Sequence, residues 1–382
     1  MKKLVRITTI PLSLNKLLGE QLFYMNQFYE VIAVSSDEEN LQKTAKKFGV
    51  RYHAIPMTRQ ITPLKDLRAI WQLYRFLKTE KPEIVHSHTP KAGLVTMIAA
   101  YFAEVPVRLH TVAGLPLLEV SGFKRKVLNL VEKLTYVCAT KVYPNSKNLE
   151  KIIIQQKFCK AEKLMVIGNG SSNGIDLQYF SPSEISTDEN ISLKQKLGIS
   201  DDDFVFIFVG RLVKDKGINE LVAAFEKVQK ENANIKLLLV GPLEHDLDPL
   251  KPETLAIIEN NSAIISVGYQ EEVRPYFAIS DVLVFPSYRE GFPNVVLQSL
   301  AMELPAIVTN INGCNEIVIN GENGFLIPPK NEVEIEKEML KMVQDQEYYH
   351  FLKKNSRNSV LKYDQQLIWD GLKLEYEDVL DF

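Results

Sequence analysis

The chain has 382 residues, of which 46% are hydrophobic and 24% are charged, with a formal net charge of -3. This length and balance predict about two globular domains and exclude a disordered, fibrous or collagen-like protein. Basic residues outnumber acidic ones in residues 1–190, and the reverse holds in the remainder. We therefore expect the first half, and not the second, to approach anionic ligands or surfaces.

In the first half, short β-branched runs alternate with amphipathic helical segments. Strands are expected at Lys3–Thr9, Tyr29–Ser35, Arg51–Ile55, Ile84–Ser87, Val107–Thr111 and Lys141–Pro144. Helices are expected at Asp37–Phe48, at Pro63–Lys78 and from about Lys91. This rhythm is typical of a parallel sheet that is covered by helices on both faces.

The polar stretch Pro182–Ser192 reads as a linker or surface loop, and the rhythm then restarts. Strands are expected at Phe204–Val209, Lys236–Val240, Ile264–Val267, Val282–Phe285, Ala306–Val308 and Gly324–Ile327. Helices are expected at Gly217–Glu231, Glu272–Ala278, Asn294–Met302 and Glu332–Gln344. The pattern predicts an α/β fold with two doubly wound, Rossmann-like domains, 1–180 and 181–364, facing across a cleft. A C-terminal helix in 365–382 is expected to pack back on the first domain.

Targeting signals and cysteine spacing point to the cytoplasm. Cys138, Cys159 and Cys314 form neither a C-x-x-C pair nor a disulfide spacing, which suits a reducing compartment. The start of the chain has no apolar segment of a signal peptide. The longest apolar stretch, Gly93 to Phe102, is shorter than the roughly 20 residues that a membrane-spanning helix needs. We expect a cytoplasmic protein that at most sits on a membrane face.

Several nucleotide and hydrolase motifs are absent. The first expected strand is followed by Thr8-Thr9-Ile10-Pro11 and not by G-x-G-x-x-G. The chain contains no G-x-x-x-x-G-K-[ST], and its one G-x-S-x-G match, Gly170–Gly174, lies in the loop between the two expected domains and not in a strand-to-helix elbow. A dinucleotide oxidoreductase, a P-loop ATPase and a serine hydrolase of the elbow type are therefore disfavoured.

Two cations stand where a buried strand passes into a helix in the second half. The strand ends at Gly210, and Arg211 and Lys216 precede the helix that begins near Gly217. Cations beside the free amides of a helix start form an anion site, and an Arg fork with a compact Lys charge suits a diphosphate. The alternative is two ordinary surface cations.

A second cluster follows the expected strand Val282–Phe285. Glu290 lies in a glycine-containing loop at the carboxyl end of that strand, and Asn294 is a good N-cap for the next helix. Gln298 falls one helical turn later, on the same face as Asn294. A carboxylate, free amides and a polar helix residue could hold a sugar, a phosphate and a ribose in turn.

Histidines mark the strand ends of the first half. His110 is expected to end a strand and to face the cleft, although a satisfied strand-end histidine is the alternative. His86 and His88 share one strand face, but nothing completes a zinc set. Lys91 stands at a helix start, where it could meet an acceptor phosphate.

These motifs resemble the donor-site signature of glycosyltransferase family 4, whose members are retaining enzymes of GT-B fold. The resemblance covers nearly the whole chain and implies that Arg211 and Lys216 bind the donor diphosphate. It also implies that Glu290 binds the donor sugar and that His110 lies near that sugar. Gln298 replaces the usual ribose-binding Glu, and its amide is a neutral, weaker acceptor. The implied donor site comprises Gly210, Arg211, Lys216, Gly291, Phe292, Asn294, Val295 and Gln298.

Three further segments narrow the resemblance to a branch that extends undecaprenyl-diphosphate-linked oligosaccharides in capsule, O-antigen or glycan assembly. They are Pro11-Leu12-Ser13-Leu14, His86-Ser87-His88-Thr89-Pro90-Lys91-Ala92-Gly93 and Asn312-Gly313-Cys314-Asn315-Glu316. The implied acceptor-binding residues are Ser13, His88 and Lys91. Lys124-Arg125-Lys126, beside Leu117, Leu118 and Phe123, would suit an anionic membrane face, with a solvated helix start as the alternative.

The resulting hypothesis is a retaining hexosyltransferase that moves a sugar from a nucleotide-sugar, UDP-hexose or UDP-N-acetylhexosamine, to a polyprenyl-diphosphate glycan. No cofactor is expected. No metal ion is expected either, because no D-x-D stands at a plausible strand end, and Asp201-Asp202-Asp203 lies at the start of a strand. No nucleic-acid partner is expected, because no known module is present. The alternatives are a transferase for a soluble acceptor, a nucleotide-sugar epimerase and a non-catalytic partner subunit.

Overall fold

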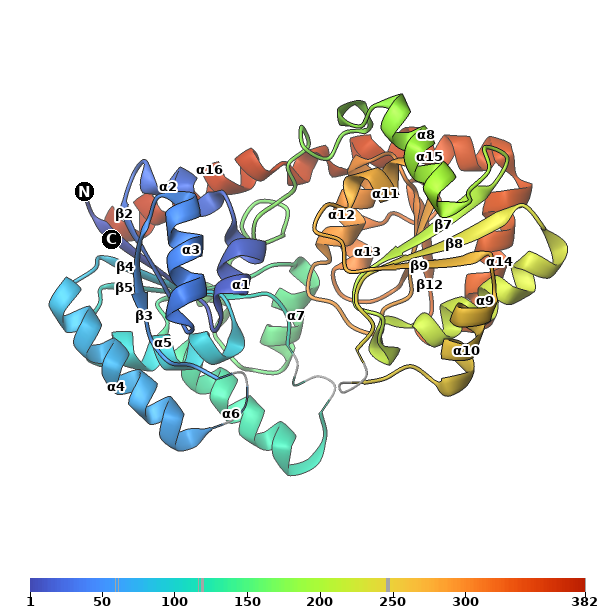
Figure 1. Cartoon of the computed structure of the whole chain (residues 1–382). Coiled ribbons are helices and arrows are strands. Elements are labelled where there is room, and N and C mark those ends of the chain that lie inside the picture. Colours follow the sequence, from blue (N-terminus) through green and yellow to red (C-terminus); the bar gives the residue numbers. More distant parts are fainter. Residues whose placement is uncertain (59, 61, 116, 118–119, 245–247, 382) are drawn as a thin grey trace. The chain divides into compact units, whose positions relative to one another are not determined.

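The computed structural model describes residues 1–381 except 59, 61, 116, 118–119 and 245–247. The chain divides into two compact units, shown in Figure 1. Unit 1 comprises Met1–Gly174 and Gln365–Phe382, and unit 2 comprises Ile175–Asp364. Each unit contains one parallel six-stranded sheet, so the α/β fold with two doubly wound domains is confirmed.

The boundary between the units lies earlier than the expected boundary after residue 180. The side chain of Arg357, in unit 2, donates hydrogen bonds to the carbonyl oxygens of Leu177 at 2.6 Å and Phe180 at 2.8 Å. The amide of Ile175 donates to the carbonyl of Tyr363 at 2.9 Å. Residues 175–180 are therefore tied to unit 2 by backbone contacts that the sequence pattern does not reveal.

The sheet of unit 1 has the strand order β3-β2-β1-β4-β5-β6. Its strands are β1 (Lys3–Ile7), β2 (Glu30–Ser35), β3 (Arg51–Ala54), β4 (Ile84–Ser87), β5 (Val107–Val112) and β6 (Lys141–Pro144). β4 is buried along its whole length, and β5 is buried at every residue except Arg108, as expected for strands covered on both faces.

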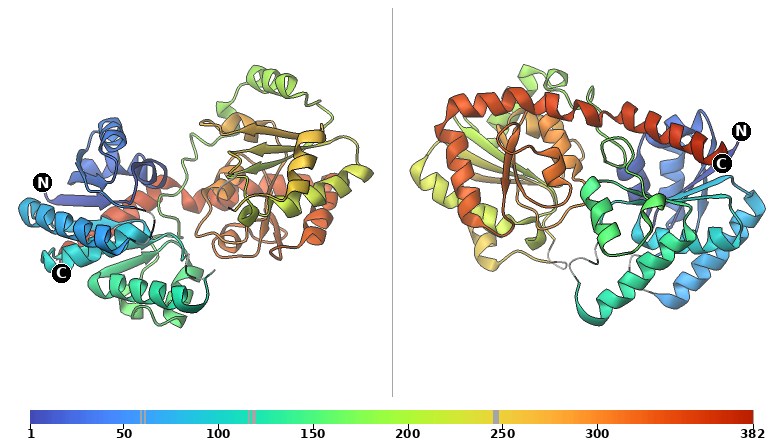
Figure 2. Two further views of the ribbon diagram at one scale, coloured as in Figure 1. Left: turned by 60° about the horizontal axis from the view of Figure 1, so that its bottom comes forward. Right: turned by 180° about the vertical axis from the view of Figure 1, so that it is seen from behind.

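Helices cover both faces of this sheet. The helical segments are α1 (Pro11–Ser13), η1 (Leu14–Leu18), α2 (Gln21–Asn26), α3 (Glu38–Phe48), α4 (Pro63–Glu80), α5 (Pro90–Phe102), α6 (Gly122–Cys138), α7 (Lys147–Gln155), η3 (Ala161–Lys163) and α16 (Gln365–Asp381). α4, α5, α6 and α7 contribute to the cores on one face, whereas η1, α2, α3 and α16 contribute to the core on the other. Figure 2 shows α16, in red, from behind. Trp369 and Tyr376 of this helix are buried in the core of unit 1.

The sheet of unit 2 has the strand order β12-β11-β10-β7-β8-β9. Its strands are β7 (Phe204–Val209), β8 (Ile235–Val240), β9 (Ile264–Gly268), β10 (Val282–Phe285), β11 (Ala306–Thr309) and β12 (Gly324–Ile327). Its helical segments are η4 (Pro182–Glu184), α8 (Thr187–Leu197), η5 (Lys214–Lys216), α9 (Ile218–Glu231), α10 (Pro252–Asn260), α11 (Arg274–Ala278), α12 (Asn294–Ala301), α13 (Cys314–Ile317), α14 (Glu332–Gln344), α15 (Gln346–Val360) and η6 (Leu361–Tyr363).

The expected linker at Pro182–Ser192 is wrong, because α8 begins within it. Ser186 caps this helix by accepting a hydrogen bond from the Glu189 amide, and the Glu189 carboxylate accepts one from the Ser186 amide in return. This capping box is a helix-start signal even where few apolar residues follow. None of the helices described for the chain combines the length and the apolar composition needed to cross a membrane.

Candidate active site

The strand order of unit 2 defines a switch point between β7 and β10. After β7 the chain continues to β8, toward one edge of the sheet, and after β10 it continues to β11, toward the other edge. Ligands of doubly wound sheets bind outside the carboxyl ends of the strands at such a point. The loop after β7 carries Arg211 and Lys216, and the loop after β10 carries Glu290, so both sequence clusters meet at this edge.

Glycines allow the loops at this edge to touch. A Cβ atom on Gly217 would lie 2.2 Å from the carbonyl oxygen of Pro286, in the loop after β10. A Cβ atom on Gly313, which follows β11, would lie 2.2 Å from the carbonyl oxygen of Gly291. Both glycines also have positive φ angles, 71° and 78°. Any side chain at either position would push the loops apart.

The ammonium of Lys216 donates a hydrogen bond to the carboxylate of Glu290, so the two residues form an ion pair. Their side chains are 17% and 15% exposed. A second pair joins the same loops, because Arg289 contacts the Asp215 carboxylate at 2.8 Å. The structure therefore brings together the residues predicted for the donor diphosphate and for the donor sugar.

Arg211 lies at the more open side of the loop. Its side chain is 46% exposed and pairs with Glu244 at 2.9 Å. Gly210 precedes it, and the carbonyl of Gly210 would lie only 1.8 Å from a Cβ atom on Gly241. The loops after β7 and β8 are thus packed backbone against backbone, and the guanidinium of Arg211 reaches outward from them.

The start of α12 differs from the sequence expectation in one detail. The N-cap is Pro293, and Asn294 is the first helical residue and makes no side-chain capping bond. Asn294, Val295 and Gln298 are partly exposed, so their side chains can reach a ligand. Phe292, in contrast, is 8% exposed and packs edge-on against the Tyr363 ring at 5.4 Å, which indicates a packing role.

Sequence reasoning missed the role of Asn312, which was quoted only as part of a family motif. Its side-chain amide donates to the carbonyl oxygens of Gly291 at 2.8 Å and of Glu290 at 3.3 Å. Cys314, one residue beyond Gly313, is fully buried, and burial together with the nearby Glu290 charge raises the pKa of its thiol. The Asn-Gly pair at 312–313, in the short loop after the buried strand β11, is the signal that could have indicated this support.

In unit 1, His110 does not end its strand, because β5 continues to Val112. Its ring is 3% exposed, and Nδ1 lies 2.8 Å from the hydroxyl oxygen of Ser87. A Cβ atom on Gly93 of α5 would lie 2.4 Å from this ring, so the helix covers it. Burial lowers the pKa of His110 to about 4, and the imidazole is neutral at physiological pH. The expectation that His110 ends its strand is therefore wrong.

The three residues predicted for the acceptor lie in different surroundings. Lys91 forms an ion pair with Asp66 of α4, and the two side chains are 11% and 13% exposed, so the charge of Lys91 is already neutralised. His88 is buried and accepts a hydrogen bond from Arg6 at 3.0 Å. Ser13 is partly exposed at the end of α1.

The expected membrane patch on α6 is only partly formed. Phe123 is 81% exposed, and Lys124 and Lys126 are exposed beside it. Arg125 turns back and donates to the Leu117 carbonyl and to Asn129, and Leu117 itself is 1% exposed. Leu118, the remaining residue of the expected patch, lies outside the described residues.

Comparisons with known proteins bear on the identity of the chain. Residues 24–170 match the family model "Glycosyl transferase 4-like domain", and residues 189–359 match "Glycosyl transferases group 1". A similar relative is the Staphylococcus aureus "Capsular polysaccharide biosynthesis glycosyltransferase CapM", 34% identical over 99% of this chain and 98% of the relative.

Two other relatives carry substrate names. The Escherichia coli "UDP-Gal:alpha-D-GlcNAc-diphosphoundecaprenol alpha-1,3-galactosyltransferase" is 32% identical over 82% of this chain and 80% of the relative. The Campylobacter jejuni "N,N'-diacetylbacillosaminyl-diphospho-undecaprenol alpha-1,3-N-acetylgalactosaminyltransferase" is 26% identical over 92% of each chain.

A solved structure of similar fold is that of Anabaena Alr3699/HepE in complex with UDP and glucose. It has a TM-score of 0.83 and 17% identity, and the match covers 99% of this chain and all of the other. The family models, the relatives and the GT-B fold agree with the donor-type clusters at the switch point of unit 2. The chain belongs to glycosyltransferase family 4 and is a GT-B-fold hexosyltransferase of polysaccharide biosynthesis.

Proposed function

We propose that the protein transfers a hexose or N-acetylhexosamine from a UDP-sugar to a polyprenyl-diphosphate-linked glycan, with retention of configuration. The observation that carries this proposal is the contact between Lys216 and Glu290 at the switch point of unit 2. The named acceptors of two relatives, both diphosphoundecaprenol-linked sugars, support the acceptor class. The names of those relatives also specify α-1,3 products, and an α product from an α-linked nucleotide sugar is retention.

The Lys216–Glu290 pair suggests how the donor is held. A donor diphosphate would take over the Lys216 ammonium, because a phosphate oxygen offers it the same charge-assisted hydrogen bond. Glu290 would then be free to accept hydrogen bonds from the sugar hydroxyls. The ion pair thus holds both side chains in position and neutralises their charges before the substrate binds.

Positive charge in this site would be most useful when the sugar–phosphate bond breaks. Negative charge then grows on the departing diphosphate, and fixed cations stabilise it in the transition state. Lys216 and the more exposed Arg211 supply that charge, so the proposal includes no metal ion. Gln298 would meet the ribose through its amide, and the glycosyl acceptor would attack from the face that the diphosphate leaves.

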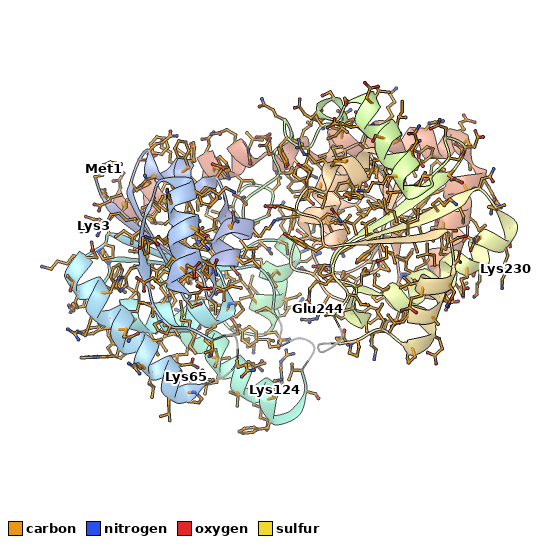
Figure 3. All side chains as sticks on the ribbon, in the orientation of Figure 1. Met1, Lys3, Lys65, Lys124, Lys230 and Glu244 are labelled. Carbon is orange, nitrogen blue, oxygen red and sulfur yellow. The ribbon has the colours of Figure 1, made fainter. Side chains whose placement is uncertain are left out.

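The acceptor class implies work at a membrane, and one surface of unit 1 fits that setting. Apolar side chains are exposed on α4 and α6, which flank α5, and we call this face the α4–α6 surface. Its exposed apolar residues are Leu64, Leu67, Trp71, Phe123, Leu130, Leu134 and Val137. Basic side chains accompany them, including Lys65 and Lys124, which are labelled in Figure 3. We propose that this surface contacts the anionic inner face of the cytoplasmic membrane.

A transfer assay tests the reaction. The full chain is incubated with a panel of UDP-sugars and with GlcNAc-diphosphoundecaprenol, the acceptor in the name of the E. coli relative. We expect one UDP-sugar to give an extended lipid-linked product whose new linkage is α by NMR. Donor consumption without an acceptor, a β product, or transfer only to soluble sugars would contradict the proposal.

Liposome co-sedimentation tests the membrane contact. Each cation near an anionic surface contributes about 1 kcal/mol. Binding to phosphatidylglycerol vesicles should therefore fall steeply with salt and in the double variant Lys124→Ala/Lys126→Ala. Lys230→Ala, on α9 of unit 2, is the matched control and should bind like the wild type. Equal binding by the double variant would remove this surface from the proposal.

A further inference from the structure

The strand order of unit 1 defines its own switch point, between β1 and β4. Arg6 lies on β1 at this point, and its side chain is 0% exposed. Its Nε donates to Nε2 of His88 at 3.0 Å, and one Nη donates to the side-chain oxygen of Gln21 at 2.6 Å. The other terminal nitrogen, Nη1, has no hydrogen-bond partner among the described residues.

A fully buried guanidinium with only neutral partners is unusual, because buried charges in proteins are nearly always paired. No carboxylate of the described residues forms an ion pair with Arg6. Glu375 of α16, a buried carboxylate that packs over the same sheet face, accepts a hydrogen bond from Tyr143 at 2.9 Å instead. The fold therefore holds an uncompensated positive charge at the point where a doubly wound sheet binds its ligand.

Arg6 also fixes the proton of His88. A guanidinium can only donate, so Nε2 of His88 must be the acceptor and the ring proton must sit on Nδ1. Nδ1 is buried and has no partner among the described residues. Burial, together with the neighbouring His86 and Arg6 charges, lowers the pKa of His88 well below its ordinary value, so the ring stays neutral. His88 thus presents one unused N–H donor.

This donor belongs to a residue that lines a small cavity of about 20 Å³. Asn145 and Ser172 line the same cavity, and each has one side-chain oxygen without a partner among the described residues. The space admits a single oxygen atom. The hydroxyl of Ser172 can donate to such an oxygen, and the Asn145 amide can turn its NH₂ toward it.

The helix that follows His88 adds a positive potential. α5 begins two residues later, at Pro90, and its first turn contains no acidic residue. The charge of Lys91 in this turn is balanced by Asp66 of α4, so the remaining positive character comes from the helix start itself. A buried cation, an unused N–H and a helix start therefore coincide at one switch point.

We propose that Arg6 and His88 form an anion site in unit 1 that takes a phosphate oxygen of the polyprenyl-diphosphate acceptor. His88 donates to that oxygen through Nδ1, and Arg6 is a positioning residue that fixes the tautomer of His88 and supplies the charge. This inference rests on the proposed function, because it assigns the diphosphate of that acceptor to unit 1.

Binding experiments separate this site from the donor site. The full chain is first saturated with UDP, which occupies the site of unit 2, and is then titrated calorimetrically with inorganic pyrophosphate and with geranyl diphosphate. We expect the wild type to bind both probes. Arg6→Met and His88→Ala should weaken binding of geranyl diphosphate tenfold or more, while UDP binding stays within twofold. His88→Asn, which retains an N–H near the Nδ1 position, should bind more tightly than His88→Ala.

Stability is the second readout. Replacing an unpaired buried cation by an apolar side chain of similar length removes a desolvation penalty, so Arg6→Met should melt at the wild-type temperature or above it. A lowered melting temperature together with a binding loss below tenfold would make Arg6 a structural residue and overturn the proposal. If Arg6→Met does not fold, His88→Ala and His88→Asn decide alone.

The remaining outcomes are also decisive. If the wild type binds pyrophosphate but not geranyl diphosphate, the site is one for a free anion, and the assignment to the acceptor is overturned. A wild type that binds neither probe beyond UDP would overturn the site altogether. Either failure leaves the transfer assay intact, because wild-type transfer to a lipid-linked acceptor is measured without reference to Arg6, and only its absence defeats the proposed function.

Discussion

The two switch points of this chain share one topology but treat their cations differently. In unit 2, Lys216 at the β7–β10 edge is paired with Glu290 and remains partly exposed. In unit 1, Arg6 at the β1–β4 edge is fully buried and bonds only to neutral groups. A cation that is already paired within the chain can change its partner from a carboxylate to a substrate phosphate without a large change in free energy. A charge left unbalanced lowers the stability of the fold, and binding of the proposed anion would offset that loss.

The largest effect should come from the paired cation. Lys216→Ala removes the charge that stabilises the departing diphosphate, and losing one such donor costs on the order of 10²–10³ in turnover. Steady-state rates at saturating donor measure it. Lys227→Ala, which breaks a surface pair with Glu332 on the same unit, is the control and should keep wild-type turnover. Wild-type turnover in Lys216→Ala would contradict the claim that the paired cation of unit 2 stabilises the departing diphosphate.

Acid should weaken unit 1 through its buried histidines. The pKa of His110 is about 4 in the folded chain and about 6.5 when unfolded, so the unfolded state binds more protons between these values. Stability is therefore fully present above about pH 6.5 and is lost as pH falls toward 4, by about 3 kcal/mol for this residue. Chemical denaturation at a series of pH values should show a shallower acid slope for His110→Asn. An unchanged slope would contradict the neutral, buried state of His110.

The loop contacts of unit 2 are tested by two glycines with similar backbone angles. Gly217 has φ 71° and a blocked Cβ position, whereas Gly198 has φ 66° and open space around it. An alanine in the left-handed conformation costs roughly 1–2 kcal/mol at either site. Gly217→Ala should lose more stability than Gly198→Ala and should also weaken UDP binding, as measured by thermal melting with and without UDP. Equal losses and unchanged UDP binding would contradict the close loop packing.

A smaller effect is expected at Gln298, where the chain departs from its family. Gln298→Leu would leave a ribose hydroxyl unpaired and should weaken UDP binding by about 1–3 kcal/mol. Gln298→Glu should bind UDP at least as tightly as the wild type, because a charged acceptor makes the stronger hydrogen bond. Calorimetry with UDP measures both variants. Wild-type affinity in Gln298→Leu would place the ribose contact elsewhere.

Strand positions followed from the sequence because buried parallel strands are short apolar runs between helix signals, as at Phe204–Val209. The meeting of Lys216 with Glu290 could also be predicted, since both follow strands whose carboxyl ends share one edge. The order of residues along the chain indicates where strands end, but it does not show which of the loops after those strands contact one another. For this reason the support from Asn312 and the close approach of Gly217 were not predicted.

The interpretation of unit 1 was less successful, because it depended on charge partners. Lys91 looked like a free cation, but Asp66, on the neighbouring helix α4, neutralises it. His110 was expected to end its strand, but β5 continues to Val112, and Gly93 lets α5 lie directly on the His110 ring. Arg6 lies in the expected strand Lys3–Thr9 and was not identified as a site residue, although a basic residue within Leu4-Val5-Arg6-Ile7 is itself a sign of a buried charge.

Two-substrate kinetics test the central claim most directly, with the UDP-sugar that is active in the transfer assay as the donor and GlcNAc-diphosphoundecaprenol as the acceptor. Substitutions at the two switch points should change different kinetic parameters. Arg6→Met should raise the KM for the acceptor tenfold or more and leave the KM for the donor within twofold. Lys216→Ala should lower kcat by 10²–10³ and leave the acceptor KM nearly unchanged. If both variants change the same parameter, or if Arg6→Met changes neither KM, the two edges do not divide donor and acceptor between them.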